Sequence, residues 1–166
     1  NSSENGLREK LFGIKNFGIW DEELIKDVGA NAKMNEFQAA MGLCNLRHID
    51  RELAKRKAVV EHYNERLSGV NGLKISAPQK DVKPNYAYYP VIFEPEEFGK
   101  SRDEIYELLK VNEIYARKYF YPLTNTFECY KGMFDMGDTP VALDLSKKVL
   151  TLPLYADLRI DQVDRI

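Results

Sequence analysis

A long periodic stretch from Met34 to Leu67 constrains the fold of this chain more than any other feature. Apolar side chains recur along it at steps of three and four, which places them on one face of a helix, and charged residues fill the opposite face. A helix of that length would measure about 50 Å at 1.5 Å per residue, which exceeds the width of a small domain. The pattern therefore predicts one long helix over residues 34–67 that connects two bodies.

The two halves of this predicted helix differ in composition. The first half carries the small residues Ala39, Ala40 and Gly42, which permit another element to approach closely. We expect this half to be more deeply buried than the second, charge-rich half. The apolar stripe changes phase near residue 45, which argues against a stand-alone coiled coil.

The residues before the long helix predict a short helix and a loop. A serine near the start supplies a cap for a helix that Gly13 should end. The loop that follows carries Phe17 and Trp20, two large side chains that a loop crossing solvent rarely needs. From the residues alone, we favour the interpretation that they fill a small local core. The alternative is that another part of the protein covers them.

The residues after the long helix predict alternating strands and helices. Gly69 and Gly72 should end the long helix. The expected elements are then a strand at 86–93, a helix capped by Ser101, a strand at 114–121, a helical segment at 126–131, a helix from Pro140 to Ser146, a strand at 149–152 and a helix at 157–166. Pro90 in the first strand argues for a sheet edge or a bulge. This order predicts an α/β layer arrangement.

The composition argues against several kinds of partner. A formal net charge of -2 indicates no basic surface for nucleic acid or for an anionic membrane. No apolar run reaches the roughly 18 residues of a membrane span, and no signal peptide is evident. Two distant cysteines, Cys44 and Cys129, indicate reduced thiols in a cytoplasmic protein. Both ends of the sequence look like cuts in a longer chain, because it starts without methionine and stops within a helical pattern.

Few residues are arranged for catalysis or metal binding. His48 and His62 both fall in the long helix, and no serine or cysteine is placed for activation by either of them. Asp135, Asp138 and Asp144 lack the spacing of a calcium-binding loop, so we assign no metal.

A short motif before the long helix is the best prediction of an anion-binding site. Gly29, Asn31 and Lys33 place an amide and an ammonium group near the N-terminus of that helix, where partial positive charge favours anions. The same pattern is equally ordinary as a turn before a capped helix. The motif alone leaves both interpretations open.

Three stretches of the sequence follow a known family pattern. Residues 29–43 contain Gly-Ala-Asn-Ala-Lys-Met, then Gln-Ala-Ala and Gly-Leu, where the family has Gly-x-Asn-x-Arg-Met, Gln-Ala-Ala and Gly-Leu. Residues 116–123 and 140–155 agree with two further family segments, in the same order along the chain. Over essentially its whole length, the sequence resembles the DegT type of nucleotide-sugar aminotransferases.

The resemblance implies an α/β fold, namely the C-terminal part of a fold-type-I transferase that depends on pyridoxal 5'-phosphate. Residues 1–33 would be a remnant of the large cofactor-binding domain, residues 34–68 a long connecting helix, and residues 69–166 a small C-terminal α/β domain. Family members transfer an amino group, usually from glutamate, to a keto carbon of a nucleotide-linked deoxysugar. The Schiff-base lysine of the family lies before residue 1. The resemblance therefore implies no catalytic residue in this chain and no activity of the chain alone.

Four residues match family positions near the cofactor or the substrate. Asn31 matches an asparagine that reaches across a homodimer with shared active sites to the cofactor phosphate of the neighbouring subunit. Lys33 stands where the family has an arginine associated with substrate phosphates, so a point charge replaces a planar fork. Thr124 stands where many relatives have a histidine near the sugar, and Tyr121 is a substrate-side residue by its place in the same segment. These departures leave the identity of the sugar open.

Two other functions stay open at this point. Relatives in which histidine replaces the Schiff-base lysine are dehydratases, and the deciding residue lies outside this sequence. In a different class, the chain would be a non-enzymatic dimerisation module whose interface is the long helix and the loop around Trp20.

Overall fold

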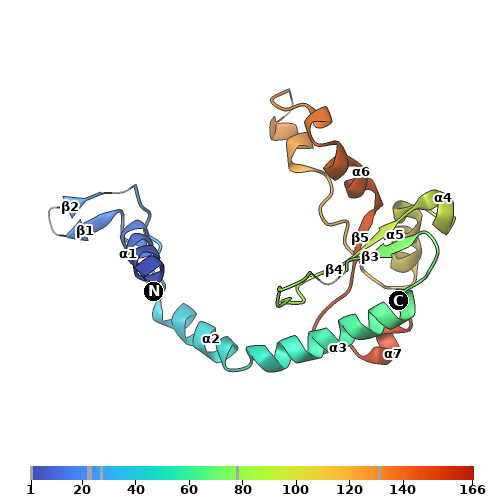
Figure 1. Cartoon of the computed structure of the whole chain (residues 1–166), viewed down its shortest axis with the longest axis horizontal. Coiled ribbons are helices and arrows are strands. Elements are labelled where there is room, and N and C mark those ends of the chain that lie inside the picture. The colour runs from blue at the N-terminus through green and yellow to red at the C-terminus, as the bar shows by residue number, and fades with distance from the viewer. Residues whose placement is uncertain (1, 22–23, 27, 78, 131) are drawn as a thin grey trace. The chain divides into compact units, whose positions relative to one another are not determined.

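The computed structural model of the chain describes residues 2–21, 24–26, 28–77, 79–130 and 132–166. The chain divides into two compact units, a first unit of Asn1–Ile49 and a second unit of Asp50–Ile166, and Figure 1 labels the helices and strands. The elements of the first unit are α1 (Ser2–Lys15), β1 (Ile19–Asp21), β2 (Leu24–Ile25) and α2 (Glu36–Leu46), and β1 pairs with β2 in antiparallel fashion.

The second unit is built around a small antiparallel sheet. Its strands are β3 (Leu73–Ile75), β4 (Tyr89–Phe93) and β5 (Val149–Leu152), in the order β3-β4-β5. Its helices are α3 (Ile49–Leu67), which begins at the boundary between the units, α4 (Pro95–Phe98), α5 (Arg102–Val111), α6 (Pro140–Lys148) and α7 (Ile160–Val163). Short 3-10 turns lie at η1 (Thr124–Thr126), η2 (Glu128–Tyr130) and η3 (Met136–Asp138). No helix in the described ranges is long and apolar enough to cross a membrane.

The stretch predicted as one helix over 34–67 forms two helices, so that prediction was wrong. A turn at Arg47 and His48 separates α2 from α3. The His48 amide donates to the Asn45 carbonyl at 3.0 Å, a bond to the third residue back that tightens the last turn of α2 and ends it. The break falls where the apolar stripe changes phase.

The burial of the two helices is the reverse of what we predicted. Helix α2 has no buried residue, and Phe37 on it is 89% exposed. Helix α3 buries Val59 and Tyr63. The reason is that the first unit offers no apolar interior, since Gly13 and Gly18 are its only buried residues among those whose burial is described.

Helix α1 continues past Gly13, where we expected it to end. A Cβ atom at Gly13 would lie 2.7 Å from Nε1 of Trp20, so glycine at this position lets the indole ring pack against the helix. Trp20 remains 37% exposed and Phe17 47% exposed. The two side chains therefore do not fill the local core that we had favoured from the residues alone.

Several predicted elements of the second unit agree with the structure. Strands β4 and β5 and helix α6 lie within or at the predicted ranges, and Ser101 caps α5 in a reciprocal pair with Glu104. The predicted strand at 114–121 does not form. Only Arg117 pairs with Thr151, and the Tyr121 amide bonds locally to the Lys118 carbonyl at 2.8 Å, which turns the backbone away from the sheet.

Three smaller differences concern short elements. Strand β3 and helix α4 were not predicted, because runs of three or four residues give little periodic signal. The segment predicted as helical at 126–131 forms 3-10 turns in its described part, and the helix predicted at 157–166 is reduced to α7.

Pro90 lies in the central strand, although we had expected an edge strand or a bulge. Thr151, opposite Pro90, exchanges both of its backbone hydrogen bonds with Arg117, at 2.9 and 2.7 Å. The ring nitrogen of Pro90 therefore faces the β3 side, where pairing already ends at Ile75 opposite Val91. The sheet loses no hydrogen bond at this proline.

One face of the sheet forms the core with α3 and α5. Val91 and Leu150 are completely buried, and the Tyr63 ring on α3 stacks on Tyr89 with centroids 4.6 Å apart. The Tyr63 hydroxyl donates to the Pro153 carbonyl at 3.0 Å. Burial raises the pKa of Tyr89 to about 12 and also raises the pKa of Tyr63, so both hydroxyls stay protonated at neutral pH.

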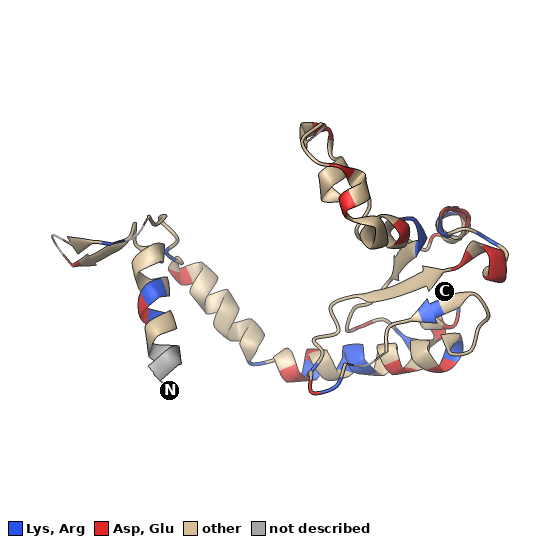
Figure 2. Cartoon of the chain, turned by 45° about the horizontal axis from the view of Figure 1, so that its top comes forward, with Lys and Arg blue, Asp and Glu red and all other residues tan. Residues whose placement is uncertain are grey.

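Ion pairs fasten the C-terminal segment to α3, along which Figure 2 shows basic and acidic residues close together. Lys55 and Asp157 pair at 2.7 Å, and Asp164 accepts from His62 at 2.8 Å and from Arg66 at 3.1 Å. These groups are partly solvated, so each pair contributes modestly, but together they hold the last residues of the chain against α3.

We predict that Gly72→Ala destabilises the chain much more than Gly69→Ala. Both glycines have positive φ, 72° and 80°. A Cβ atom at Gly72 would lie 2.2 Å from the backbone nitrogen of Phe98, whereas at Gly69 it would meet open space. We expect a loss of about 1 kcal/mol in unfolding free energy for Gly69→Ala and more than about 3 kcal/mol for Gly72→Ala. Urea unfolding followed by circular dichroism measures both, and equal losses would contradict the packing described here.

We also predict that the chain by itself self-associates through the first unit. The exposed apolar face of α2, with Phe37 and Met41 at 89% and 64% exposure, lacks a covering surface in that unit. Light scattering should detect oligomers, and a dye for apolar surfaces should bind. Replacing both residues by serine should reduce both signals, whereas the matched pair Val111→Ser and Val141→Ser in the second unit should not. A monomer that binds no dye would contradict this expectation.

Candidate functional site

The strand-like segment that carries Asn31 is fixed by its backbone. Asn31 forms an isolated antiparallel bridge with Asn16, just after α1. On either side of the bridge, the Phe17 amide donates to the Ala30 carbonyl at 3.2 Å and the Ala32 amide donates to the Lys15 carbonyl at 3.0 Å. The main chain at Asn31 therefore has a defined position that does not depend on its side chain.

Gly29 of the Gly-x-Asn motif has a packing role. A Cβ atom there would lie 2.4 Å from both the Gly18 nitrogen and the Ile14 carbonyl oxygen. Only glycine lets this segment approach the end of α1 so closely. Gly29 of the motif that predicted an anion site thus also allows the segment to pack against the end of α1.

The side chains of Asn31 and Lys33 are exposed. In the described part of the chain, the Asn31 carboxamide has no hydrogen-bond partner, and Lys33 Nζ lies 5.3 Å from the centre of the Phe17 ring. The Ala32 amide also donates to the Ala30 carbonyl at 3.0 Å, so the backbone makes a tight turn at Asn31, and Lys33 follows two residues later. Together the two side chains supply neutral and charged donors that an anion can use.

The N-terminus of α2 adds less to this site than predicted. Asn35 caps the helix, with its side chain accepting from the Gln38 amide at 2.8 Å and its own amide donating to the Gln38 side chain at 3.0 Å. Glu36 puts a negative charge in the first turn. The helix end is thus largely satisfied by its own residues, and anion binding here rests on the side chains of Asn31 and Lys33.

Tyr121 lies in the second unit over a buried arginine. The guanidinium carbon of Arg102 is 5.1 Å from the centre of the Tyr121 ring, a cation–π contact. Arg102 is only 2% exposed, and its Nη1 donates to the Val149 carbonyl at 2.9 Å. Tyr121 itself is 54% exposed. Thr124, also exposed, begins the turn η1 three residues later.

An ionic network surrounds the arginine. Arg102 Nε donates to Asp103 Oδ1 at 2.9 Å, and Lys118 also pairs with that oxygen. The hydrogen bond from Lys118, with the nearby Arg102 charge, lowers the pKa of Asp103 below its ordinary value. Asp103 is therefore ionised at neutral pH and links α5 to the segment that leads to Tyr121.

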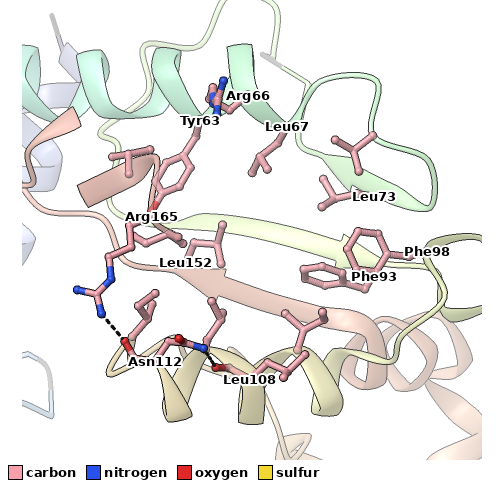
Figure 3. A pocket seen from close by; sticks show the side chains of 16 residues that line it. Tyr63, Arg66, Leu67, Leu73, Phe93, Phe98, Leu108, Asn112, Leu152 and Arg165 are labelled. Carbon is pink, nitrogen blue, oxygen red and sulfur yellow. Dashed lines mark hydrogen bonds between the residues drawn. The ribbon is translucent and has the colours of Figure 1, made fainter. Parts of the chain in front are cut away.

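The predicted site residues thus fall into two pairs. Asn31 and Lys33 share one segment of the first unit, and Tyr121 and Thr124 share one segment of the second unit. An apolar pocket of about 460 Å³ between α3 and α5, drawn in Figure 3, contains none of the four. Phe93 and Leu152 from the sheet and Leu67 from α3 line that pocket. Among the described residues, no cluster of three or more metal-binding side chains occurs.

One feature of the sequence points to Arg102. A cation at the first position of a helix opposes the helix dipole, and α5 otherwise begins with the acids Asp103 and Glu104. Such a residue requires other partners, and here they are the Val149 carbonyl, Asp103 and the Tyr121 ring. The partners themselves were not predictable, because two of them are distant in the sequence.

Comparisons with known proteins agree with this architecture. A family model described as DegT/DnrJ/EryC1/StrS aminotransferase family matches residues 2–166. A dTDP-4-amino-4,6-dideoxy-D-glucose transaminase from Escherichia coli is 41% identical over 155 residues, which are 92% of this chain and 42% of that protein. A protein of the same name from Shigella dysenteriae is 37% identical over 166 residues, which are 100% of this chain and 44% of that protein.

A solved structure shares the fold at similar coverage. The crystal structure of DesI, determined in the presence of its TDP-sugar product, is 27% identical and superimposes with a TM-score of 0.83 over 97% of this chain and 41% of that chain. The chain thus spans less than half of the length of these relatives. The predicted α/β fold of a pyridoxal-phosphate-dependent sugar aminotransferase is confirmed. The chain belongs to the DegT/DnrJ/EryC1/StrS aminotransferase family.

Proposed function

We propose that this chain is the C-terminal part of an aminotransferase that acts on a dTDP-linked 4-keto-6-deoxyhexose. In the proposed reaction, L-glutamate gives up its amino group and becomes 2-oxoglutarate, and the keto carbon of the sugar becomes an amino carbon. The observation that carries the proposal is the match to transaminases of dTDP-4-amino-4,6-dideoxy-D-glucose, at 41% and 37% identity over nearly the whole chain. Both relatives are named transaminases, which favours transamination over dehydration as the reaction of the complete protein.

The division of the chain supports its place in a longer protein. The second unit has a buried core of its own, whereas the described part of the first unit exposes its apolar residues. We propose that residues 1–33 belong to a large cofactor-binding domain and that residues 69–166 form the small C-terminal domain. Residues 34–68 connect these two domains. The complete enzyme would be a cytoplasmic homodimer whose lysine and remaining cofactor ligands come from the large domain.

The residues of this chain fit a role as phosphate ligands. Pyridoxal phosphate, when bound, supplies an electron sink for the proton transfers of transamination. The free carboxamide of Asn31, on a segment fixed by its backbone, can donate to the cofactor phosphate of the partner subunit. Lys33, two residues on, can neutralise phosphate charge of the nucleotide sugar. The lysine is a point charge, so it attracts the phosphates without fixing their orientation as an arginine fork would.

The second unit supplies groups for the sugar. The hydroxyls of Tyr121 and Thr124 are exposed and can each donate and accept hydrogen bonds. Threonine does not titrate near neutral pH, so at position 124 it can orient a sugar hydroxyl but cannot transfer a proton as a histidine would.

A half-reaction experiment tests the proposed activity. The chain would be expressed together with its large domain and loaded with pyridoxal phosphate. L-Glutamate should then convert the cofactor to its amine form, with loss of visible absorbance and formation of 2-oxoglutarate. The dTDP-linked 4-keto sugar should restore the absorbance and yield the amino sugar. Restoration by simple keto acids but by no nucleotide sugar would refute the proposed substrate.

We predict that Asn31→Ala in the complete enzyme weakens cofactor binding by about 2 kcal/mol, or about thirtyfold in Kd. The loss arises because one phosphate oxygen is left without its donor, while the backbone bridge to Asn16 stays intact. Absorbance titration of the cofactor measures the effect, and the thermal midpoint should stay unchanged. Asn45→Ala on α2 removes the same group elsewhere and should leave Kd unaffected. Equal affinity of Asn31→Ala and the unmodified protein would remove Asn31 from the site.

A further inference from the structure

Arg102 is a buried cation that the fold itself does not obviously require. Its side chain is 2% exposed, so burial removes nearly all contact of the guanidinium group with bulk water, which costs free energy. An apolar side chain of similar size would pack at this position without that cost. The charge ties α5 to the start of β5 through Val149, and it also lies beside the Tyr121 ring.

The contacts of Arg102 link α5 and the start of β5 to the segment before η1. Through Val149 the guanidinium group is attached to the start of β5, and through Asp103 it is coupled to Lys118. Its guanidinium carbon lies 5.1 Å from the centre of the Tyr121 ring. Lys118 is held in turn over the Tyr106 ring at 4.5 Å. Arg102 thus contacts the Tyr121 ring, and the ion pair between Lys118 and Asp103 fastens the preceding backbone to α5.

The tyrosines of the second unit differ in what their hydroxyls do. The Tyr63 hydroxyl donates to the Pro153 carbonyl, the Tyr89 hydroxyl donates to Asn64, and the Tyr119 hydroxyl accepts from Arg117 at 2.7 Å. Tyr121 and Tyr106 each have a cation beside the ring, and within the described ranges neither hydroxyl has a hydrogen-bond partner. Tyr121 is the exposed one of the two, at 54%. A fixed ring with an unused hydroxyl suits a group that binds a ligand, because little side-chain freedom is lost on binding.

We propose that Arg102 is a positioning residue for the sugar, acting through Tyr121. The inference rests on the proposed function, since it takes the ligand of Tyr121 to be the hexose of a nucleotide sugar. The guanidinium group lies at cation–π distance from the ring while its Nε bonds to Asp103 and its Nη1 to Val149, three contacts that lysine cannot make together. The Tyr121 hydroxyl is thereby held where it can donate to, or accept from, a sugar hydroxyl.

The two half-reactions of the complete, cofactor-loaded enzyme test this proposal. We expect Arg102→Lys to raise KM for the nucleotide sugar about tenfold, as for one lost hydrogen bond, and to leave the rate of the glutamate half-reaction within about twofold. Asp103→Asn, which keeps Arg102 but weakens its anchor, should act in the same direction with a smaller effect. Arg159→Lys, at an exposed arginine paired with Asp161, is the control and should change neither half-reaction.

A double-substitution cycle separates positioning from a general structural effect. Tyr121→Phe should also raise KM for the sugar about tenfold, and combining it with Arg102→Lys should give about tenfold again, because both remove the same interaction. A hundredfold loss in the double variant would mean that Arg102 acts independently of Tyr121 and would overturn the proposal. Equal slowing of both half-reactions by Arg102→Lys would overturn it as well.

A measurement without substrate distinguishes this inference from the proposed function. In protein with isotope-labelled tyrosine, the Tyr121 ring signals, assigned through Tyr121→Phe, should shift in Arg102→Lys, because the guanidinium charge no longer lies beside the ring. An unchanged Tyr121 signal would refute positioning by Arg102, whatever the protein catalyses. Failure of the unmodified protein to accept any nucleotide sugar would instead refute the proposed function and, with it, the sugar as ligand of Tyr121.

Discussion

The packing of α3 on the buried face of β4 and β5 is the interaction on which the second unit depends. The stacked pair of Tyr63 and Tyr89 joins helix to sheet, and both hydroxyls are satisfied by hydrogen bonds. The segment that leads to Tyr121 is connected to β5 at two points. The bridge from Arg117 to Thr151 fixes one side of that strand, and the bond from Arg102 to Val149 fixes its start. The segment that carries Tyr121 and Thr124 is thus tied, at Arg117 and through Arg102, to a largely buried strand.

In the first unit, the segment with Asn31 and Lys33 is held in position without a buried apolar core. Close backbone approach at Gly29 and the bonds around Asn31 define the position of the proposed phosphate ligands, while the apolar side chains around them stay exposed. Main-chain hydrogen bonds determine where the segment lies, and side chains are left to bind. The backbone bonds around Asn31 do not involve the side chain of Lys33, so a different side chain at position 33 leaves them available.

Local signals predicted the parts of the fold that local physics determines. The serine cap of α5, the proline at the start of α6 and the apolar strand at 149–152 were each read from neighbouring residues, and each is present. Strand β3 depends on its pairing with β4, and the end of α2 depends on a turn that no glycine or proline marks. The family pattern indicated Asn31, Lys33, Tyr121 and Thr124, whose roles remain predictions. The contacts of Arg102 could not be predicted, because Val149, its carbonyl acceptor, is far away in the sequence.

Pro90 has a consequence for how the sheet meets other molecules. With its ring nitrogen directed to the side where β3 has ended, β4 presents no amide hydrogen there to an approaching strand. A foreign segment could not continue the β3 ladder past Ile75, so intermolecular strand addition is blocked at the place where the central strand would otherwise be open. A single imino acid thus keeps a three-stranded sheet from acting as a template for aggregation at that corner.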